Sequence, residues 1–257
     1  MRPSGSIACV RKPTQALARC ELSYVARTPI DIDLAQKQHS AYVAALAELG
    51  AQIEWLPPLP DHPDAVFVED TAVLVSDLAI LARPGAPLRR GEVRSVAQAL
   101  SAHRKVRRIE APASLDGGDV LPIGNTLFVG MTARTNAAAV TALRRIIEPR
   151  DGHVVAVPVT GCLHLKSACT FIPPDTLVAN CEWIDRALFR RVRIIETDRR
   201  EPTAGNTLTL GGCTLVSASA PRTAEKLRRA GVNTRSLDIS ELEKAEAGLT
   251  CMSLVLA

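Results

Sequence analysis

Aromatic side chains are scarce in this chain of 257 residues, of which phenylalanine, tryptophan and tyrosine make up only 3%. Proteins that bind single-stranded nucleic acid usually stack the bases on aromatic side chains, so the composition argues against that class. The net charge of +4 does not change this, because the arginines are scattered and their densest groups lie in or beside periodic segments. Such groups are typical of solvated faces, and we expect no nucleic-acid partner.

The chain also lacks the signals of several other classes. No apolar run is long enough to span a bilayer, and the N-terminal residues contain no apolar segment of the signal-peptide type. No G-x-G-x-x-G or P-loop motif occurs, so nothing supports a nucleotide site. The seven cysteines are an odd number, which is typical of a reducing compartment. We therefore expect no membrane association and a location in the cytoplasm.

A metal site has to be weighed separately. Cys162 and His164 lie two residues apart, and Cys251 and Asp116 could add to them as ligands. Zinc sites, however, usually show a C-x-x-C pair or an H-E-x-x-H motif, and this sequence has neither. We therefore expect no metal.

Aliphatic residues, by contrast, are plentiful and follow a repeating arrangement. Apolar residues make up 47% of the sequence, so Leu, Val, Ile and Ala must fill the core. Five segments with helical apolar spacing are each followed by an extended apolar segment. The five predicted helix–strand pairs are 33–49 with 51–56, 91–102 with 106–110, 135–147 with 153–157, 182–189 with 192–196, and 221–230 with 233–238.

A polar elbow that leads into short strands recurs between these pairs. The five elbows are 66–74, 115–121, 163–171, 205–210 and 248–256. A turn and a further strand follow the first four of them, at 78–82, 126–130, 176–179 and 213–217. The fifth elbow has no strand after it. We predict that residues 6–10 supply the missing strand, which would bring both ends of the sequence into one unit.

The length of the repeat suggests how the units are arranged. Equivalent strand positions are 55, 47, 39 and 42 residues apart, counted between Glu54, Ile109, Ala156, Ile195 and Leu237. Such periods are typical of propellers and arrays, but WD-type blades contain no helix. We predict an α/β fold in which one domain, residues 1–257, forms a five-bladed propeller of ββαβ units around a pseudo-fivefold axis. An ordinary open α/β sheet is the alternative, but it would not bring all five elbows together.

The elbows contain polar residues that an apolar core does not tolerate without partners. They are Glu69 and Asp70, Asp116 and Asp119, His164 and Lys166, and Cys251. Taken singly, each has a simpler explanation, because a buried histidine is more often a hydrogen-bonded core residue and a buried cysteine a small apolar one. Because they occupy equivalent positions of the repeat, however, they would converge at the centre of the ring, which indicates a functional site.

Several short motifs within the elbows occur together in a specific order. They are Phe67-Val-Glu-Asp70, Leu115-Asp-Gly-Gly-Asp-Val-Leu121, Arg134-Thr-Asn136, His164-Leu-Lys166 and Thr250-Cys251, with Arg83-Pro-Gly-Ala-Pro87, Arg89-Arg90 and Asn180-Cys-Glu-Trp183 in addition. From about residue 7 to its end, the sequence resembles the dimethylargininases of the guanidine-modifying (pentein) superfamily. The resemblance implies the five-bladed propeller and a hydrolase that needs no metal or organic cofactor. It also implies a small-molecule substrate, a free methylated arginine, that is converted to citrulline and an alkylamine.

The resemblance also implies a role for each matched residue. Cys251 corresponds to the nucleophile, His164 to the general acid and base, and Asp116 to the carboxylate that orients the histidine. The residues that correspond to substrate-binding positions are Asp64, Glu69 and Asp70 around the guanidinium, Arg89 and Arg134 at the α-carboxylate, and Leu22 in an expected lid at about 17–31. The oligomeric state stays open, and a homodimer is one option.

Lys166 bears on the choice of substrate. Arginine deiminases and amidinotransferases of this superfamily usually carry an acidic residue at that position, which grips a terminal guanidinium nitrogen. Without it, N-methyl groups could occupy the space and leave no buried acceptor unpaired, so we expect methylated arginine to be preferred. The alternative is that Lys166 points away into a salt bridge and specificity resides in the lid.

Three other functions stay open at this point. The first is a different guanidine-modifying enzyme, such as an arginine deiminase. The second is a ligand-binding module that has lost turnover, against which the intact set of Cys251, His164 and Asp116 argues. The third is a papain-like protease, which we reject because no helix would begin behind Cys251.

Overall fold

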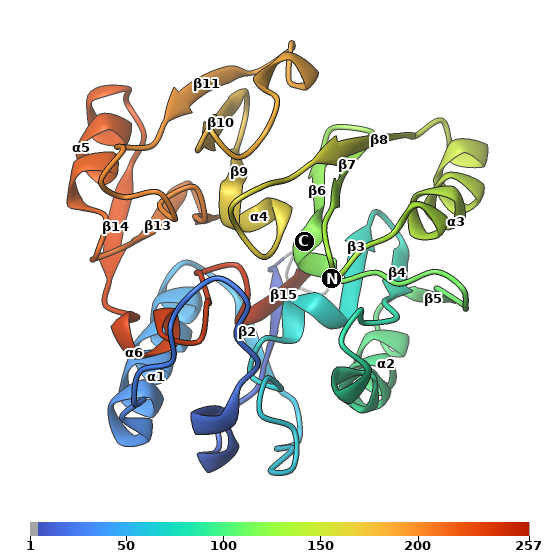
Figure 1. The fold of residues 1–257 in the computed structure, drawn as a ribbon, viewed down its shortest axis with the longest axis horizontal. Helices are drawn as coiled ribbons and strands as arrows, with labels where there is room; N and C mark the ends of the chain where they lie inside the picture. Colours follow the sequence, from blue (N-terminus) through green and yellow to red (C-terminus); the bar gives the residue numbers. More distant parts are fainter. Residues whose placement is uncertain (1–4, 257) are drawn as a thin grey trace.

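The computed structural model describes residues 5–256, and within them five three-stranded sheets surround a common centre (Figure 1). Each sheet has the same connectivity: its first strand pairs antiparallel with the middle strand, which pairs parallel with the last. The five sheets are β15-β1-β2, β3-β4-β5, β6-β7-β8, β9-β10-β11 and β12-β13-β14. The predicted five-bladed α/β propeller is therefore confirmed, and the open sheet was the wrong alternative.

The boundaries of the middle and last strands agree with the predicted segments to within one or two residues, and each first strand lies in the later part of a predicted elbow or begins there. The first strands are β15 (Ser253–Leu256), β3 (Ala72–Val75), β6 (Val120–Ile123), β9 (Cys169–Ile172) and β12 (Leu208–Leu210). The middle strands are β1 (Ile7–Val10), β4 (Leu78–Leu81), β7 (Thr126–Met131), β10 (Thr176–Ala179) and β13 (Cys213–Ser217). The last strands are β2 (Gln52–Trp55), β5 (Lys105–Arg108), β8 (His153–Pro158), β11 (Arg193–Glu196) and β14 (Thr234–Leu237).

Four of the five blades have an α-helix in the connection between the middle and the last strand. These helices are α1 (Ile32–Glu48), α2 (Val93–Ser101), α3 (Ala137–Ile147) and α5 (Pro221–Arg229), and they lie around the outside of the ring (Figure 1). A connection of this kind is needed because the two strands that it joins are parallel. α1 begins where the Asp31 carboxylate accepts the Leu34 N–H, and it ends before Gly50, whose φ of +97° suits a residue without a side chain.

The fourth blade departs from the prediction. The segment 182–189 was expected to form a helix, but only the single 3₁₀ turn η6 (Arg186–Leu188) forms there. The segment makes contacts with other parts of the chain instead. The backbone of Ile184 forms an isolated bridge with Val159, and the Phe189 ring stacks on Phe128 with ring centroids 4.5 Å apart. A segment this short gains little from helix formation, so these contacts decide its conformation.

The first blade contains strands from both ends of the sequence. β1 lies between β15 and β2, and Ile7 to Val10 are in register with Leu256 to Ser253. The prediction that residues 6–10 complete the blade of the fifth elbow is therefore confirmed. This pairing helps to fix the position of Cys251, which lies two residues before β15.

Short helical turns form most of the elbows and the remaining connections. They are η1 (Gln15–Arg19), η2 (Val68–Thr71), η3 (Pro87–Glu92), η4 (Gly117–Asp119), η5 (Glu148–Arg150), α4 (Leu165–Ala168) and α6 (Ser240–Glu243). η2, η4 and α4 each lead directly into the first strand of a blade. The polar residues of the elbows are therefore placed near the centre of the ring, between sheets whose aliphatic side chains form the core. Within residues 5–256, no helix has the length and apolar character to cross a membrane.

Candidate active site

Residues of four elbows lie in or beside one small cavity of about 20 Å³. Asp70 lies on η2, Asp116 directly before η4, His164 directly before α4 and Cys251 two residues before β15, and all four side chains are buried. We call these four residues the floor of the site. The cavity is lined by Glu21, Asp64, Phe67, Asp70, Arg89, Arg134, Leu163, His164, Ala245, Glu246, Ala247 and Cys251. Three of the five predicted elbows therefore contribute to the lining. A fourth contributes Asp116, which bonds to His164 from outside the lining, and the elbow 205–210 does not line the cavity.

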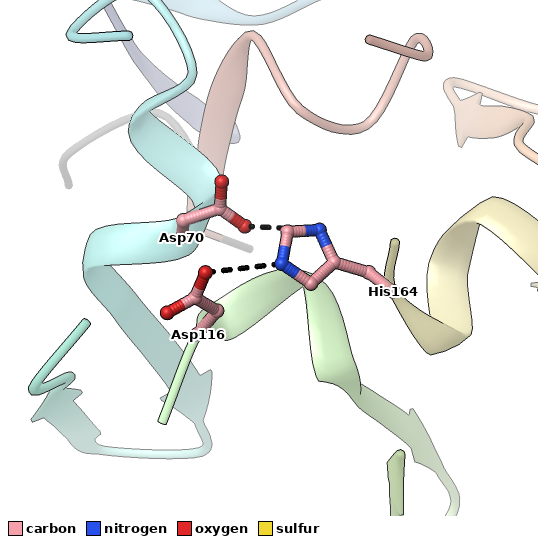
Figure 2. Close-up of side chains that lie close together, drawn as sticks. All are labelled: Asp70, Asp116 and His164. Carbon is pink, nitrogen blue, oxygen red and sulfur yellow. Dashed lines mark hydrogen bonds and ion pairs between the residues drawn. The ribbon is translucent and has the colours of Figure 1, made fainter. Parts of the chain in front are cut away.

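The His164 imidazole lies between two carboxylates (Figure 2). Its Nε2 is 3.0 Å from Asp116 Oδ2, and its Nδ1 is 3.7 Å from Asp70 Oδ1. Burial alone would lower the pKa of His164, but the negative charges of Asp70, Asp119 and Asp116 outweigh it and raise the pKa to about 9. At neutral pH this histidine is therefore an imidazolium, a form that can donate a proton.

Asp70 is held from two sides. Its Oδ1 accepts the Gly118 N–H at 3.1 Å, and its Oδ2 forms an ion pair with Arg89 Nη1. Burial would raise the pKa of Asp70, but the His164 and Arg89 cations lower it below its usual value. Gly118 must be glycine here, because an added Cβ would lie 2.7 Å from Asp70 Oδ1 and 2.8 Å from His164 Nδ1.

Arg89 lines the cavity but is largely engaged by the protein. Its Nε and Nη2 donate to the Glu92 carboxylate, and Nη2 also donates to the carbonyl oxygens of Asp64 and Phe67. Glu92 itself is fully buried. Glu92 could not be singled out from the sequence, because it lies in the segment 91–102 that was predicted as an ordinary helix. In the structure it fixes the guanidinium that in turn fixes Asp70.

Cys251 is held by hydrogen bonds around its backbone. Thr250 N–H donates to Asn206 Oδ1 at 3.0 Å, and Glu69 N–H donates to the Cys251 carbonyl at 3.1 Å. The Gly248 N–H lies 3.3 Å from Sγ. Burial and the charges of Glu69 and Asp70 raise the pKa of the Cys251 thiol to about 12, so without a bound cation the thiol is neutral.

Glu69 and Lys166 lie apart from the cavity lining and pair with each other. Lys166 Nζ is 2.7 Å from Glu69 Oε1 and 3.3 Å from the Gly117 carbonyl oxygen, and Glu69 Oε2 accepts the Thr250 hydroxyl at 2.6 Å. The sequence left open whether Lys166 points away into a salt bridge. In the structure Lys166 forms such a salt bridge, with Glu69. Glu69 was expected beside the guanidinium, but it is absent from the cavity lining. Its carboxylate bonds instead to Thr250, the residue before Cys251.

Arg134 lines the same cavity, and part of its guanidinium group is unpaired. Its Nη2 forms an ion pair with Glu21 at 3.2 Å, whereas its Nη1 is buried and has no hydrogen-bond partner. Asp64 also lines the cavity and accepts the Glu21 N–H at 3.3 Å, and burial raises its pKa to about 6. A buried, unpaired guanidinium nitrogen is expected where an anionic ligand binds.

A short loop, residues 21–27, contributes Glu21 to the cavity lining, and we call this loop the lid. Most of its side chains are exposed. Leu22 was expected to contact the substrate, but it is absent from the cavity lining and instead packs against the apolar cluster shared by the first and fifth blades. Glu21 lines the cavity in its place. Neither Glu21 nor Glu246, which bonds to the lid, was singled out from the sequence.

Asp70, Asp116 and His164 each offer one ligand atom, and these atoms lie within 4.8 Å of one another. They are the residues that could hold a metal ion. Both carboxylates already accept backbone N–H groups, from Gly118 and Gly85 respectively. The set with Cys162 does not form, because the Cys162 Sγ donates to the His164 carbonyl at 3.3 Å and does not face the imidazole.

The chain is similar to several known proteins. A family model described as arginine deiminase matches residues 56–204. The chain is 42% identical to an N(G),N(G)-dimethylarginine dimethylaminohydrolase of Streptomyces coelicolor over 96% of this chain and 95% of that protein. A solved structure of the Pseudomonas aeruginosa enzyme complexed with citrulline has a TM-score of 0.93 at 33% identity and covers 98% of this chain and 99% of that one. A second, an adduct of a dimethylarginine dimethylaminohydrolase with S-methyl-L-thiocitrulline, also has a TM-score of 0.93 at 33% identity and covers 98% and 100%.

Proposed function

The chain belongs to the dimethylarginine dimethylaminohydrolase family, and we propose that it hydrolyses free N-ω-methylated arginines to citrulline and an alkylamine. The observation that carries this proposal is that a thiol, an imidazolium and a carboxylate line one cavity that also offers an unpaired guanidinium N–H. A guanidinium attached to an amino acid head group is complementary to that arrangement.

Binding of the substrate prepares the nucleophile. Asp70 accepts the guanidinium N–H groups, with Asp64 as a second carboxylate in the same cavity. The positive charge next to Sγ favours the thiolate and lowers the pKa of Cys251 from its raised value. A thiolate is the nucleophile suited to the resonance-stabilised guanidinium carbon.

The reaction then proceeds in two halves. The Cys251 thiolate attacks the guanidinium carbon, and the His164 imidazolium gives its proton to the departing alkylamine, which leaves a covalent S-alkylthiouronium. The neutral His164 next removes a proton from water, and the resulting hydroxide equivalent attacks the same carbon. The sulfur leaves as the thiolate, and citrulline is released. Asp116 keeps the imidazole oriented and supports its positive charge throughout.

The Lys166–Glu69 pair supports the preference for a methylated substrate. Lys166 neutralises Glu69 and keeps this carboxylate out of the cavity lining. Position 166 itself offers no carboxylate, so one terminal guanidinium nitrogen is left without an acidic acceptor. A nitrogen that carries methyl groups loses nothing in such a place, whereas an unmodified nitrogen leaves its N–H groups unsatisfied.

The test is a comparison of kcat/KM for asymmetric dimethylarginine, monomethylarginine and arginine, with citrulline as the measured product. We expect both methylated forms to exceed arginine. If arginine equals or exceeds them, the chain is an arginine deiminase instead. If no citrulline forms from any of them, it is a ligand-binding module.

The contribution of Lys166 can be measured in the same assay. Lys166→Met should raise kcat/KM for arginine relative to dimethylarginine by about 10-fold, because the freed Glu69 becomes an acceptor of charge-assisted hydrogen bonds. Lys226→Met, on the outer helix α5, removes the same charge far from the site and should leave the ratio unchanged. An unchanged ratio in Lys166→Met would assign the specificity to the lid.

We also propose that the five blades form a single domain and that the protein is located in the cytoplasm, as the odd number of cysteines indicates.

A further inference from the structure

The seams between neighbouring blades are filled in the same way at four of the five places. Each of α1, α2, α3 and α5 packs its apolar face between two adjacent sheets and shares one apolar core cluster with them. α3, for example, lies against the second and the third blade, and Leu78 and Ile80 of the second blade are 1% and 0% exposed in that cluster. A helix is therefore the element that closes a seam in this fold.

The seam between the third and the fourth blade is built differently. The connection 180–192 is the shortest of the five that join a middle strand to a last strand, and within these residues only the turn η6 forms. In Figure 1, α5, α1, α2 and α3 follow one another around the left, lower and right sides of the ring, and the connection with η6 crosses the remaining side, between β11 and β8. Phe189 of this connection stacks on Phe128, and both rings are buried at the base of the seam.

A groove of about 990 Å³ lies along this seam, and we call it the 3–4 groove. One wall is a face of the third blade. Phe128 and Thr126 of β7 are in register with Val155 and His153 of β8, and alternate residues of a strand point to the same face of a sheet. The fourth blade and residues 187–192 form the other wall.

The groove presents apolar side chains that are only half buried. They are Ile123, Val155, Phe171, Leu188 and Val192. Apolar surface gathered in one groove is typical of a site where another molecule binds. Since the equivalent seams take a helix, the shape that fits here is an amphipathic helix laid along the groove, with apolar residues one helical turn apart.

The rim of the groove is positively charged. Arg190 and Arg191 are exposed, and none of the residues that line the groove is acidic. Arg190 Nε donates to the Ala187 carbonyl oxygen, and neither arginine forms an ion pair within residues 5–256. A helix with carboxylates along one edge would supply acceptors to both guanidinium groups.

We propose that the 3–4 groove is a docking site for an acidic amphipathic α-helix of a partner protein. The apolar face of this helix packs on Val155, Phe171 and Leu188, and its carboxylates pair with Arg190 and Arg191. The helix takes the position that α1, α2, α3 and α5 have in the other seams. No residue that lines the groove also lines the active-site cavity, so this inference is independent of the proposed function.

The probe is a synthetic peptide of about 14 residues, held helical by side-chain lactams because so short a helix is marginal on its own. It carries leucines at positions i, i+3, i+4 and i+7 and glutamates beside them. One companion peptide has lysines in place of the glutamates, and another has the same residues rearranged without an apolar face. Fluorescence anisotropy with the full chain should show that the acidic amphipathic peptide binds at least about 10-fold more tightly than either companion.

Charge reversal tests the two arginines. Arg190→Glu combined with Arg191→Glu should reverse the preference, so that the lysine peptide binds more tightly than the acidic one. The matched control is Arg228→Glu combined with Arg229→Glu, which changes two adjacent exposed arginines on α5 and should keep the preference of the wild type. Circular dichroism should show that both variants are folded.

A photoreactive group at the centre of the acidic peptide locates the contact. Mass spectrometry should find crosslinks to residues 123–128, 171–174 or 187–192, the segments that contribute to the groove. Crosslinks elsewhere would overturn the inference. So would the absence of binding, equal binding of the three peptides, or an unchanged preference in the variant at positions 190 and 191.

Discussion

The floor and the lid of the cavity are held in contrasting ways. Asp70, Asp116 and His164 of the floor are buried and bonded to neighbouring elbows, and Asp70 and His164 lie so close to Gly118 that a Cβ there would collide with both. The lid, residues 21–27, is mostly exposed, and several of its bonds to the rest of the protein end on Asp64, Arg134 and Glu246, which line the cavity. A rigid floor keeps reacting groups in place before the substrate arrives. The bonds of the lid can be exchanged for bonds to a ligand.

This contrast predicts that changes in the floor affect kcat and changes in the lid affect KM. The strongest test is Cys251→Ser, which replaces the thiol by a much weaker nucleophile. Citrulline formation should fall by about 10,000-fold or more. The variant should keep its fold by circular dichroism and should still bind citrulline, because the floor and the lid are otherwise intact. Substantial turnover would remove Cys251 from the mechanism.

The next largest effect is expected for Asp116→Asn. The neutral amide no longer supports the imidazolium, so the pKa of His164 should fall from about 9 toward its ordinary value. Because His164 acts first as an acid, the alkaline limb of the kcat/KM profile should move to lower pH, and kcat should fall about 100- to 1,000-fold. The test is to measure kcat/KM for the two proteins from about pH 5 to about pH 10, a range that spans both pKa values. An unmoved alkaline limb would mean that His164 is not the group that titrates there.

Gly118→Ala tests the rigidity of the floor directly. The added methyl group forces Asp70 and His164 apart, and displacements of this kind cost about 100-fold in kcat. Gly5→Ala is a suitable control, since its Cβ would meet only the Gly50 carbonyl oxygen at 3.6 Å. Activity close to that of the wild type in Gly118→Ala would show that the floor adapts and that the contrast with the lid is weaker than we state.

The smallest effect belongs to the lid. Glu21 occupies Arg134 Nη2 at 3.2 Å when no substrate is bound, so the substrate carboxylate has to compete with it. Partly exposed ion pairs contribute little, so Glu21→Gln should lower KM only about 2- to 5-fold and leave kcat unchanged. Steady-state kinetics with dimethylarginine would show this. A lower kcat with unchanged KM would place Glu21 in the chemistry instead.

The sequence predicted the ring because each blade is a local unit. The apolar spacing of 33–49 and the Gly50 that ends it suffice to define α1, and the same holds for three other helices. The segment 182–189 failed for a non-local reason: Phe189 finds Phe128 on the third blade, and the pattern of the segment itself does not reveal that contact.

The site was predictable to a similar degree. The elbow motifs indicated the floor residues, and the structure brings them to one cavity. The motifs could not show that Lys166 would remove Glu69 from the lining or that Glu246 would bond to Ser23, 223 positions away in the sequence. Such roles depend on which groups from distant parts of the sequence lie next to a side chain in the folded protein. In the sequence alone, a carboxylate in a short polar stretch cannot be distinguished from an ordinary solvated residue.

The antiparallel pairing of β1 with β15 also imposes an order in time. The ribosome makes β1 first and makes Cys251 and β15 only after Asp70, Asp116 and His164. The histidine and its carboxylates are therefore synthesised while the first blade still lacks one strand. The proposed nucleophile arrives with that strand, so a translation product that stops before Cys251 would lack it.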